Sequence, residues 1–182
     1  MRAGRRALGF GLAAALAVEL TAGCARLRLE REAEAAVRRY NDALIVAYRT
    51  NDPRGLETVA GQDELRRLVA LIDLKRAGHL ALESRVESLE LLEATTPGPD
   101  AMVVRTRERW RYWDRALKPG MPAGPVFVAD LWMRWELARE SGVWKVQKGR
   151  TERSDYLEPK GFQPGAGGQS GHLARPQTSI GS

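Results

Sequence analysis

Glu108 is the residue in this chain best placed for acid–base chemistry. It belongs to the segment 102–112, in which apolar and charged residues alternate, and it takes an inward position between Thr106 and Trp110. A carboxyl group desolvated among such neighbours has a raised pKa and can serve as a general base. The alternative is a structural carboxylate near a strand end, paired with a cation or open to solvent. The residues expected to share a pocket with it are Trp110, Tyr112 and Tyr40.

The other reactive residue types form no recognisable catalytic or metal-binding pattern. His79 follows Gly78 at an expected junction between a helix and a strand, and His172 lies in a glycine-rich tail. Two such isolated histidines predict neither a catalytic dyad nor a metal site. The sequence has no glycine-rich phosphate loop, no nucleophile elbow and no paired-cysteine spacing. We therefore expect no metal, no cofactor and a non-catalytic protein, with general-base chemistry at Glu108 as the alternative.

Arginines occupy the opposite face of the segment that contains Glu108. Side chains two residues apart on a strand stand about 7 Å apart, so four like charges repel unless carboxylates or a ligand offset them. One interpretation is a solvated face, cross-paired with Glu83, Glu87, Asp130 and Glu136 on other strands. The other is a docking surface for anionic lipid or an acidic partner. The arginines are Arg105, Arg107, Arg109 and Arg111.

The five tryptophans fall in or beside the expected strands, and most should belong to the core because aromatic side chains bury large areas. Residues three apart point to opposite faces of a strand. Trp110 and Trp113 therefore cannot share a face, nor can Trp132 and Trp135. We expect one of each pair to be exposed or to line the cone mouth, and an exposed aromatic ring beside arginines suits a protein partner. The fifth is Trp144.

Residues 1–24 have the features of an export signal: a head with three arginines, an apolar run, and small residues before the only cysteine, Cys24. The segment Leu20–Cys24 resembles the lipobox of bacterial lipoproteins, which implies lipid attachment to Cys24. Thr21 and Glu19 depart from that pattern. A lone cysteine cannot form an intrachain disulfide, and lipidation would account for its position.

Two further interpretations of this segment stay open. An ordinary signal peptidase would cut near Ala22, Gly23 and Ala25. An uncleaved anchor would use the apolar run from Ala7 to Gly23, about 17 residues and close to the lower limit for a membrane span. Each interpretation places the rest of the chain in the cell envelope, in an extracytoplasmic or periplasmic position. Two of the three hold it at the membrane, by a lipid or by an anchor helix.

Composition predicts one domain, at residues 28–157, before a glycine- and proline-rich tail at 158–182 that we expect to be disordered. The formal charge is +6. Residues 1–23 contain three arginines and one glutamate, a net +2, which leaves +4 for the remainder. This excess suits an anionic membrane surface or an acidic protein, and is too small and scattered for nucleic acid.

Helices are expected first. Residues 30–50 carry a stripe of apolar residues at three- and four-residue spacing, which predicts an amphipathic helix. The Asn51-Asp52-Pro53 run ends it and leads into a short helix, and residues 63–76 predict a third helix that stops at Gly78. The stripe consists of Ala33, Val37, Tyr40, Leu44 and Ala47.

Strands follow, because the apolar period changes to two after Gly78. A strand from Leu80 shifts phase near Leu89, which indicates a bulge. A turn at 96–100, a strand at 102–112, a loop at 118–125 and a strand at 127–137 come next. A turn at 140–142 leads into a last strand with Trp144 and Val146.

Helices followed by long antiparallel strands predict an α+β fold. The helix around Tyr40–Leu44, the paired strands, and the closing hairpin of 131–137 and 141–146 resemble the nuclear-transport-factor-2-like superfamily, the cystatin-like α+β roll. The resemblance covers about residues 28–155. It implies helices packed in a cone formed by a strongly bent antiparallel sheet. Among subfamilies, the chain looks like the IMS-type domain of organelle-division proteins and like membrane-tethered bacterial assembly domains.

The resemblance sets two functional hypotheses side by side. Enzymes of the superfamily work with a pocket acid or a His–Asp pair inside the cone, and sheet-face dimers are common, so a homodimer is possible here. The first hypothesis is a membrane-tethered extracytoplasmic binding or scaffolding module, with a protein partner in the cell envelope. The alternative is a carrier or weak enzyme that holds an apolar small molecule in the cone. A carrier needs an open cavity with a few convergent polar groups, whereas a scaffold tolerates a filled cone.

Overall fold

The computed structural model describes the backbone of residues 10–159 and the side chains of residues 23–159. Residues 1–9 of the export segment and most of the C-terminal tail, including His172, lie outside the described residues. The elements in chain order are α1 (Phe10–Thr50), η1 (Arg54–Thr58), α2 (Gln62–Ala77), β1 (Leu80–Gly98), β2 (Ala101–Ala116), β3 (Phe127–Glu140) and β4 (Val143–Glu158).

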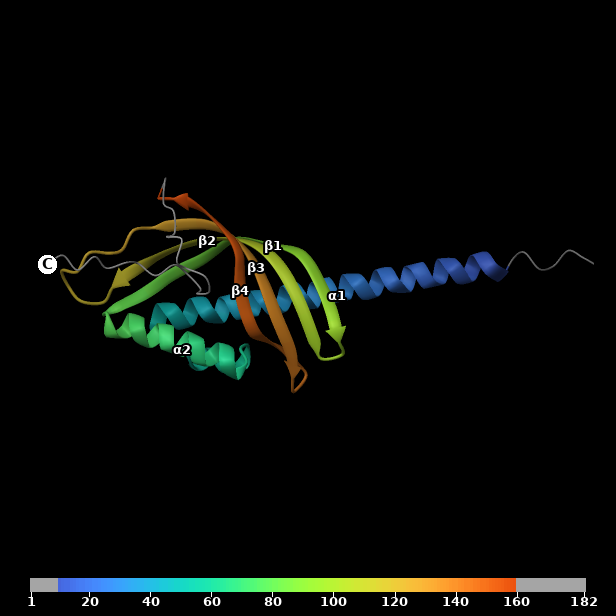
Figure 1. Ribbon diagram of the computed structural model, residues 1–182, viewed down its shortest axis with the longest axis horizontal. Helices are drawn as coiled ribbons and strands as arrows, with labels where there is room; N and C mark the ends of the chain where they lie inside the picture. The colour runs from blue at the N-terminus through green and yellow to red at the C-terminus, as the bar shows by residue number, and fades with distance from the viewer. Residues whose placement is uncertain (1–9, 160–182) are drawn as a thin grey trace, which may run out of the picture.

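The four strands form one antiparallel sheet in the order β1-β2-β3-β4, so every strand pairs with its neighbour in the chain. The sheet curves over α1, and α2 lies beside α1 beneath it (Figure 1). The fold is therefore the predicted α+β cone, with helices against a strongly bent antiparallel sheet.

Helix α1 is longer than the sequence predicts. It begins at Phe10 rather than near Glu30, because residues 10–29 are rich in Ala and Leu, contain no proline, and so favour helix. Its C-terminal part packs under the sheet while its N-terminal part projects beyond it (Figure 1). No helix in residues 10–159 is both long and apolar enough to span a membrane.

The C-terminal end of α1 is set by Asn51, as the sequence indicates. Asn51 adopts the left-handed conformation (φ 54°), and the backbone N–H of Asp52 donates to the carbonyl of Ala47 at 3.1 Å. This is the Schellman pattern, which tolerates asparagine in place of glycine. The Asn51 amide also donates to the carbonyl of Leu80 at 2.9 Å, which fixes the start of β1 against the end of α1.

The predicted alternation along the central strands is confirmed. The even-numbered positions of β2 from Met102 to Tyr112 are all buried, and the odd-numbered positions of β3 from Ala129 to Leu137 lie beside them on the same inner face of the sheet. The register shift between Val86 and Ser88 confirms the bulge expected near Leu89. The turn predicted at 96–100 is tighter than expected, because β1 continues to Gly98 and only two residues separate it from β2.

The β3–β4 hairpin closes through two residues with positive φ, Ser141 (49°) and Gly142 (82°). Positive φ at both central positions defines the type I′ turn, whose twist matches that of paired strands. Nothing lies within 4 Å of a Cβ added at Gly142, so only backbone strain opposes a side chain there.

Gly142→Ala should therefore lower the free energy of unfolding by about 1–2 kcal/mol, the cost of forcing a residue with a Cβ into left-handed conformation. Urea unfolding followed by tryptophan fluorescence measures the change. Gly98→Ala is the matched control, since Gly98 also has open space at Cβ but no positive φ. Equal destabilisation of the two variants would contradict the assigned turn.

Candidate functional site

Glu108 points into the cone from the middle of β2 and has no exposed surface. It lies neither at a strand end nor at an open mouth. The β2 pleat carries Thr106, Glu108 and Trp110 to the same inner face, and α1 brings Asn41 against them from the other side.

Three neutral donors surround the Glu108 carboxylate. The Thr106 hydroxyl donates to Oε1 at 2.6 Å, while the Asn41 amide and the Trp110 indole N–H donate to Oε2 at 3.0 and 2.8 Å. Thr106 in turn accepts the indole N–H of Trp135 on β3 at 2.9 Å. Residues from α1, β2 and β3 thus converge on one carboxyl group, which we call the Glu108 network.

Burial raises the pKa of Glu108 above its ordinary value, and the hydrogen bonds from Thr106, Trp110 and Asn41 oppose that rise. This raised pKa agrees with the general-base chemistry that the sequence suggested for Glu108. The surroundings do not favour it, because both oxygens are engaged by protein donors and none of the carboxyl is exposed. In this conformation the carboxyl cannot touch a substrate.

A second buried carboxylate, Glu64 on α2, was missed by the sequence analysis. It is 2% exposed, accepts a hydrogen bond from the Tyr40 hydroxyl, and pairs with Arg67 one turn further along α2. The Tyr48 hydroxyl is also buried and has no hydrogen-bond partner within residues 23–159. Glu64 lies in the first turn of its helix, where acidic residues are ordinary, so its position gave no signal of burial.

The four residues expected to line one pocket all lie in the core but make three different sets of contacts. Glu108 and Trp110 share the network described above. Tyr40 donates to Glu64 instead, and its ring makes an edge contact with Trp135 at 5.3 Å between centroids. Tyr112 stacks on Phe127 at 5.4 Å between centroids. These aromatic side chains pack in the core on the inner face of the sheet.

Carboxylates pair with the four arginines on the outer face of β2, which we call the arginine ladder: Arg105, Arg107, Arg109 and Arg111. Arg107 and Arg109 both bind Asp130 on β3, at 2.8 and 2.7 Å. Arg111 pairs with Glu87 on β1 at 2.7 Å, and Arg105 with Glu152 on β4 at 2.8 Å. Two of the partners, Asp130 and Glu87, are among those the sequence suggested. A ladder neutralised in this way presents little net positive charge.

The tryptophans divide as the spacing requires. Trp110 and Trp135 are buried in the cone, whereas Trp113 and Trp132 are half-buried on the outer face. The Trp132 ring lies between the guanidinium groups of Arg107 and Arg153, 5.1 and 4.3 Å from its centroid. Trp132 is therefore partly covered by cations of its own sheet.

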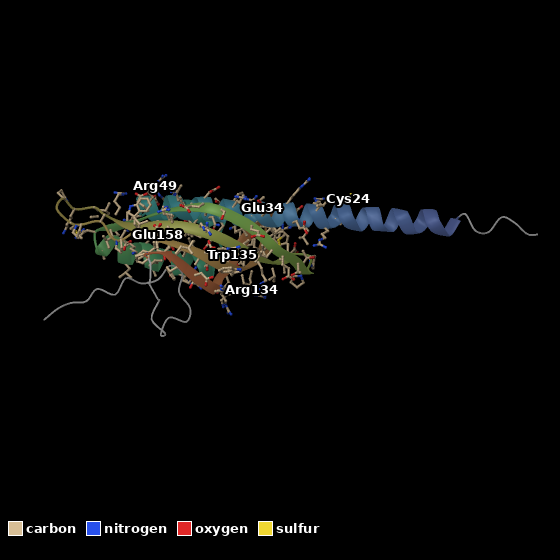
Figure 2. All side chains as sticks on the ribbon, turned by 90° about the horizontal axis from the view of Figure 1, so that it is seen from above. Cys24, Glu34, Arg49, Arg134, Trp135 and Glu158 are labelled. Atoms are coloured by element: carbon tan, nitrogen blue, oxygen red, sulfur yellow. The ribbon has the colours of Figure 1, made fainter. Side chains whose placement is uncertain are left out.

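Within residues 23–159, no three His, Cys, Asp or Glu side chains lie close enough together to hold a metal ion. His79 is exposed at the junction of α2 and β1 with a positive φ of 55°. Cys24 is exposed on α1 beyond the edge of the sheet (Figure 2).

An open groove of about 560 Å³ lies outside the cone, between α1 and the β3–β4 hairpin. Its lining includes Arg31 and Arg39 from α1 and Trp144 from the start of β4. None of the Glu108 network lines it. The sequence analysis missed this site, because α1 and the hairpin are more than 90 residues apart in the chain.

No protein-family model and no curated protein sequence matches the chain. Its structure is similar to the intermembrane space region of the chloroplast protein ARC6, with a TM-score of 0.61 and 15% identity over 66% of this chain and 94% of that one. The chain has a nuclear-transport-factor-2-like fold. The predicted fold resemblance, including that to IMS-type domains, is thus confirmed at the level of fold.

Two weaker similarities were also found. A type 2 hexachlorocyclohexane dehydrochlorinase, LinA, matches with a TM-score of 0.48 and 15% identity, covering 76% of this chain and 99% of that chain. A conserved protein from Planctomyces limnophilus matches with a TM-score of 0.44 and 16% identity, covering 64% of this chain and 91% of that one.

Replacing Glu108 should change how stability depends on pH. A carboxyl group whose folded pKa is raised contributes stability in its protonated form, below its unfolded pKa of about 4.5, and loses that contribution as pH rises through the folded pKa. Glu108→Gln removes this titration. The stability advantage of the wild type over the variant should therefore be greatest near pH 4 and shrink toward pH 7, by at most about 1.4 kcal/mol per pH unit.

Urea unfolding of both proteins across this pH range measures the difference, and carboxylates common to both cancel. Glu90→Gln, on the exposed side of β1, reports the effect of removing a surface charge. An advantage that grows with rising pH would contradict the burial assigned to Glu108.

Proposed function

We propose that this chain is a membrane-tethered, extracytoplasmic binding or scaffolding module of an envelope assembly, and that it is not catalytic. The observation that carries the proposal is the filled cone. The carboxyl group best suited to chemistry has no exposed surface and is hydrogen-bonded by Thr106, Asn41 and Trp110.

A carrier or enzyme needs a concave site in which a few polar groups converge on a ligand. Here the Thr106, Asn41 and Trp110 donors converge on the Glu108 carboxylate and not on a ligand, and the core packed around them includes Tyr40 and Trp135. The interior then serves stability, and recognition falls to the outer surface. This reasoning favours the module over the alternative, a carrier or weak enzyme for an apolar small molecule.

Tethering through Cys24 suits the geometry of α1. The first buried residue of the domain is Ala33, nine positions after Cys24. At 1.5 Å per residue, this stretch of helix would hold the domain about 14 Å from an attached lipid. Ion pairs at four-residue spacing, Arg26 with Glu30 and Arg28 with Glu32, support the helix there. The proposed location is the cell envelope, with a protein partner and with a homodimer as one possible assembly state.

Cys24→Ala should abolish both incorporation of radiolabelled palmitate and recovery in the membrane fraction, because lipid attachment needs the thiol. Gly23→Ala, which keeps a small residue before the cysteine, is the control and should retain both. Metabolic labelling with membrane fractionation measures the outcome. If neither wild type nor Cys24→Ala takes up label and both stay in the membrane, lipidation is wrong and residues 7–23 hold the protein there.

The choice between module and carrier can be tested on protein extracted from its own membranes. Native mass spectrometry should give the mass of the chain with its anchor and no small-molecule adduct, because the cone is filled. An amine-reactive cross-linker applied to intact cells should give adducts with other proteins or with a second copy. A bound small molecule together with the absence of protein adducts would contradict the proposed function.

A further inference from the structure

The groove outside the cone has two different walls. The α1 wall presents Arg31, Ala35 and Arg39, which lie at four-residue spacing and so share one face of the helix. The other wall is the β3–β4 hairpin, with Arg139, Val143 and Trp144. Val143 is 43% exposed and lies next to Trp144 in this wall. The hairpin lies at one end of the sheet, alongside α1 (Figure 1).

The hairpin wall is held in place by specific contacts. The indole N–H of Trp144 donates to Glu32 on α1 at 3.3 Å. The Arg139 guanidinium lies over the Trp144 ring, 4.5 Å from its centroid, and also contacts Glu32 at 3.5 Å. With the type I′ turn at its tip, the hairpin is a preorganised surface, and preorganisation reduces the entropy lost on binding.

Charge distinguishes this groove from the arginine ladder. Within residues 23–159, neither Arg31 nor Arg39 has an ion pair or a side-chain hydrogen bond, whereas a carboxylate offsets each ladder arginine. The lining holds three arginines and one glutamate, Glu32, a net charge of +2. Arg31 and Arg39 therefore carry charges that no described carboxylate offsets, unlike the four ladder arginines, although Arg150 and Lys148 on β4 are also without an ion pair among the described residues.

We propose that this groove binds an acidic segment of a partner protein in an extended conformation. This inference rests on the proposed function and names the partner of that same module. Arg31 and Arg39 are eight residues apart, about 12 Å along the helix axis, which an extended chain covers in about four residues. The fitting segment carries two acidic residues four positions apart, with an apolar side chain between them over Ala35 and Val143.

Charge complementarity favours another molecule over residues 160–182 of this chain as the occupant. Residues 160–182 of this chain contain Lys160 and Arg175 but no acidic side chain, so their charge does not complement the groove. An anionic lipid headgroup would match the arginines, yet it offers nothing to the exposed apolar side chains between them. A peptide segment matches both kinds of group, which favours it.

The test uses the full chain extracted from membranes and a fluorescein-labelled heptapeptide of the order glycine, aspartate, serine, leucine, serine, aspartate, glycine. Fluorescence polarisation should show saturable binding that weakens as salt is raised. The double variant Arg31→Ala/Arg39→Ala should weaken binding roughly tenfold, since each lost ion pair contributes modestly. Both side chains are exposed, so the fold should persist.

The matched control is Arg134→Ala/Arg150→Ala, which removes the same charge from the outer face of β3 and β4. It should leave binding within about twofold of wild type. A peptide with asparagine in place of both aspartates should not bind. Equal losses in the two double variants, or no saturable binding of the acidic peptide, would overturn the groove as its site. So would arginine-dependent binding of phosphatidylglycerol vesicles without binding of the peptide.

Cross-linking in intact cells separates this inference from the proposed function. If wild type forms protein adducts and the groove double variant loses them, the groove is supported as the docking site. If both form the same adducts, the groove proposal fails while the binding module stands. If wild type forms no adducts at all, the proposed function itself fails.

Discussion

The structure depends on burying one carboxyl group inside the cone with neutral donors as its only direct partners. Leaving such a group without hydrogen bonds would cost several kcal/mol, so α1, β2 and β3 must each hold a donor in register. Asn41 fixes the rotation of α1, and Thr106 ties β2 to the Trp135 indole of β3. The network thereby couples the helix to the sheet and specifies one packing arrangement for this part of the core.

The same constraint divides the molecule into an interior that is occupied and an exterior that is free to bind. On the exterior, charge is arranged unevenly. The four ladder arginines are paired with Asp130, Glu87 and Glu152, whereas the two groove arginines of α1 are not paired with any described side chain. Local compensation, and not the number of arginines, decides which surface attracts an anionic partner.

The fold was predictable because the spacing of apolar residues in the sequence reports which face of each helix and strand is buried. The stripe that includes Val37 and Leu44 and the alternation from Met102 to Tyr112 each report one buried face, and both faces proved to be in the core. The sites were less predictable, because they depend on contacts between distant elements. Periodicity placed Glu108 inward, but not the donor Asn41, and it could not show that α1 and the hairpin meet at Trp144. Glu64 looked like an ordinary first-turn acid.

Hydrogen exchange of the tryptophan indole protons tests the filled cone most directly. In a ¹⁵N–¹H spectrum with each indole assigned by single Trp→Phe replacements, Trp110 and Trp135 should exchange slowly, because their N–H groups are buried and donate to Glu108 and Thr106. Trp113 and Trp132, half-buried on the outer face, should exchange much faster. Fast exchange of Trp110 and Trp135 under native conditions would show a cone open to solvent and would contradict a non-catalytic module with a closed interior.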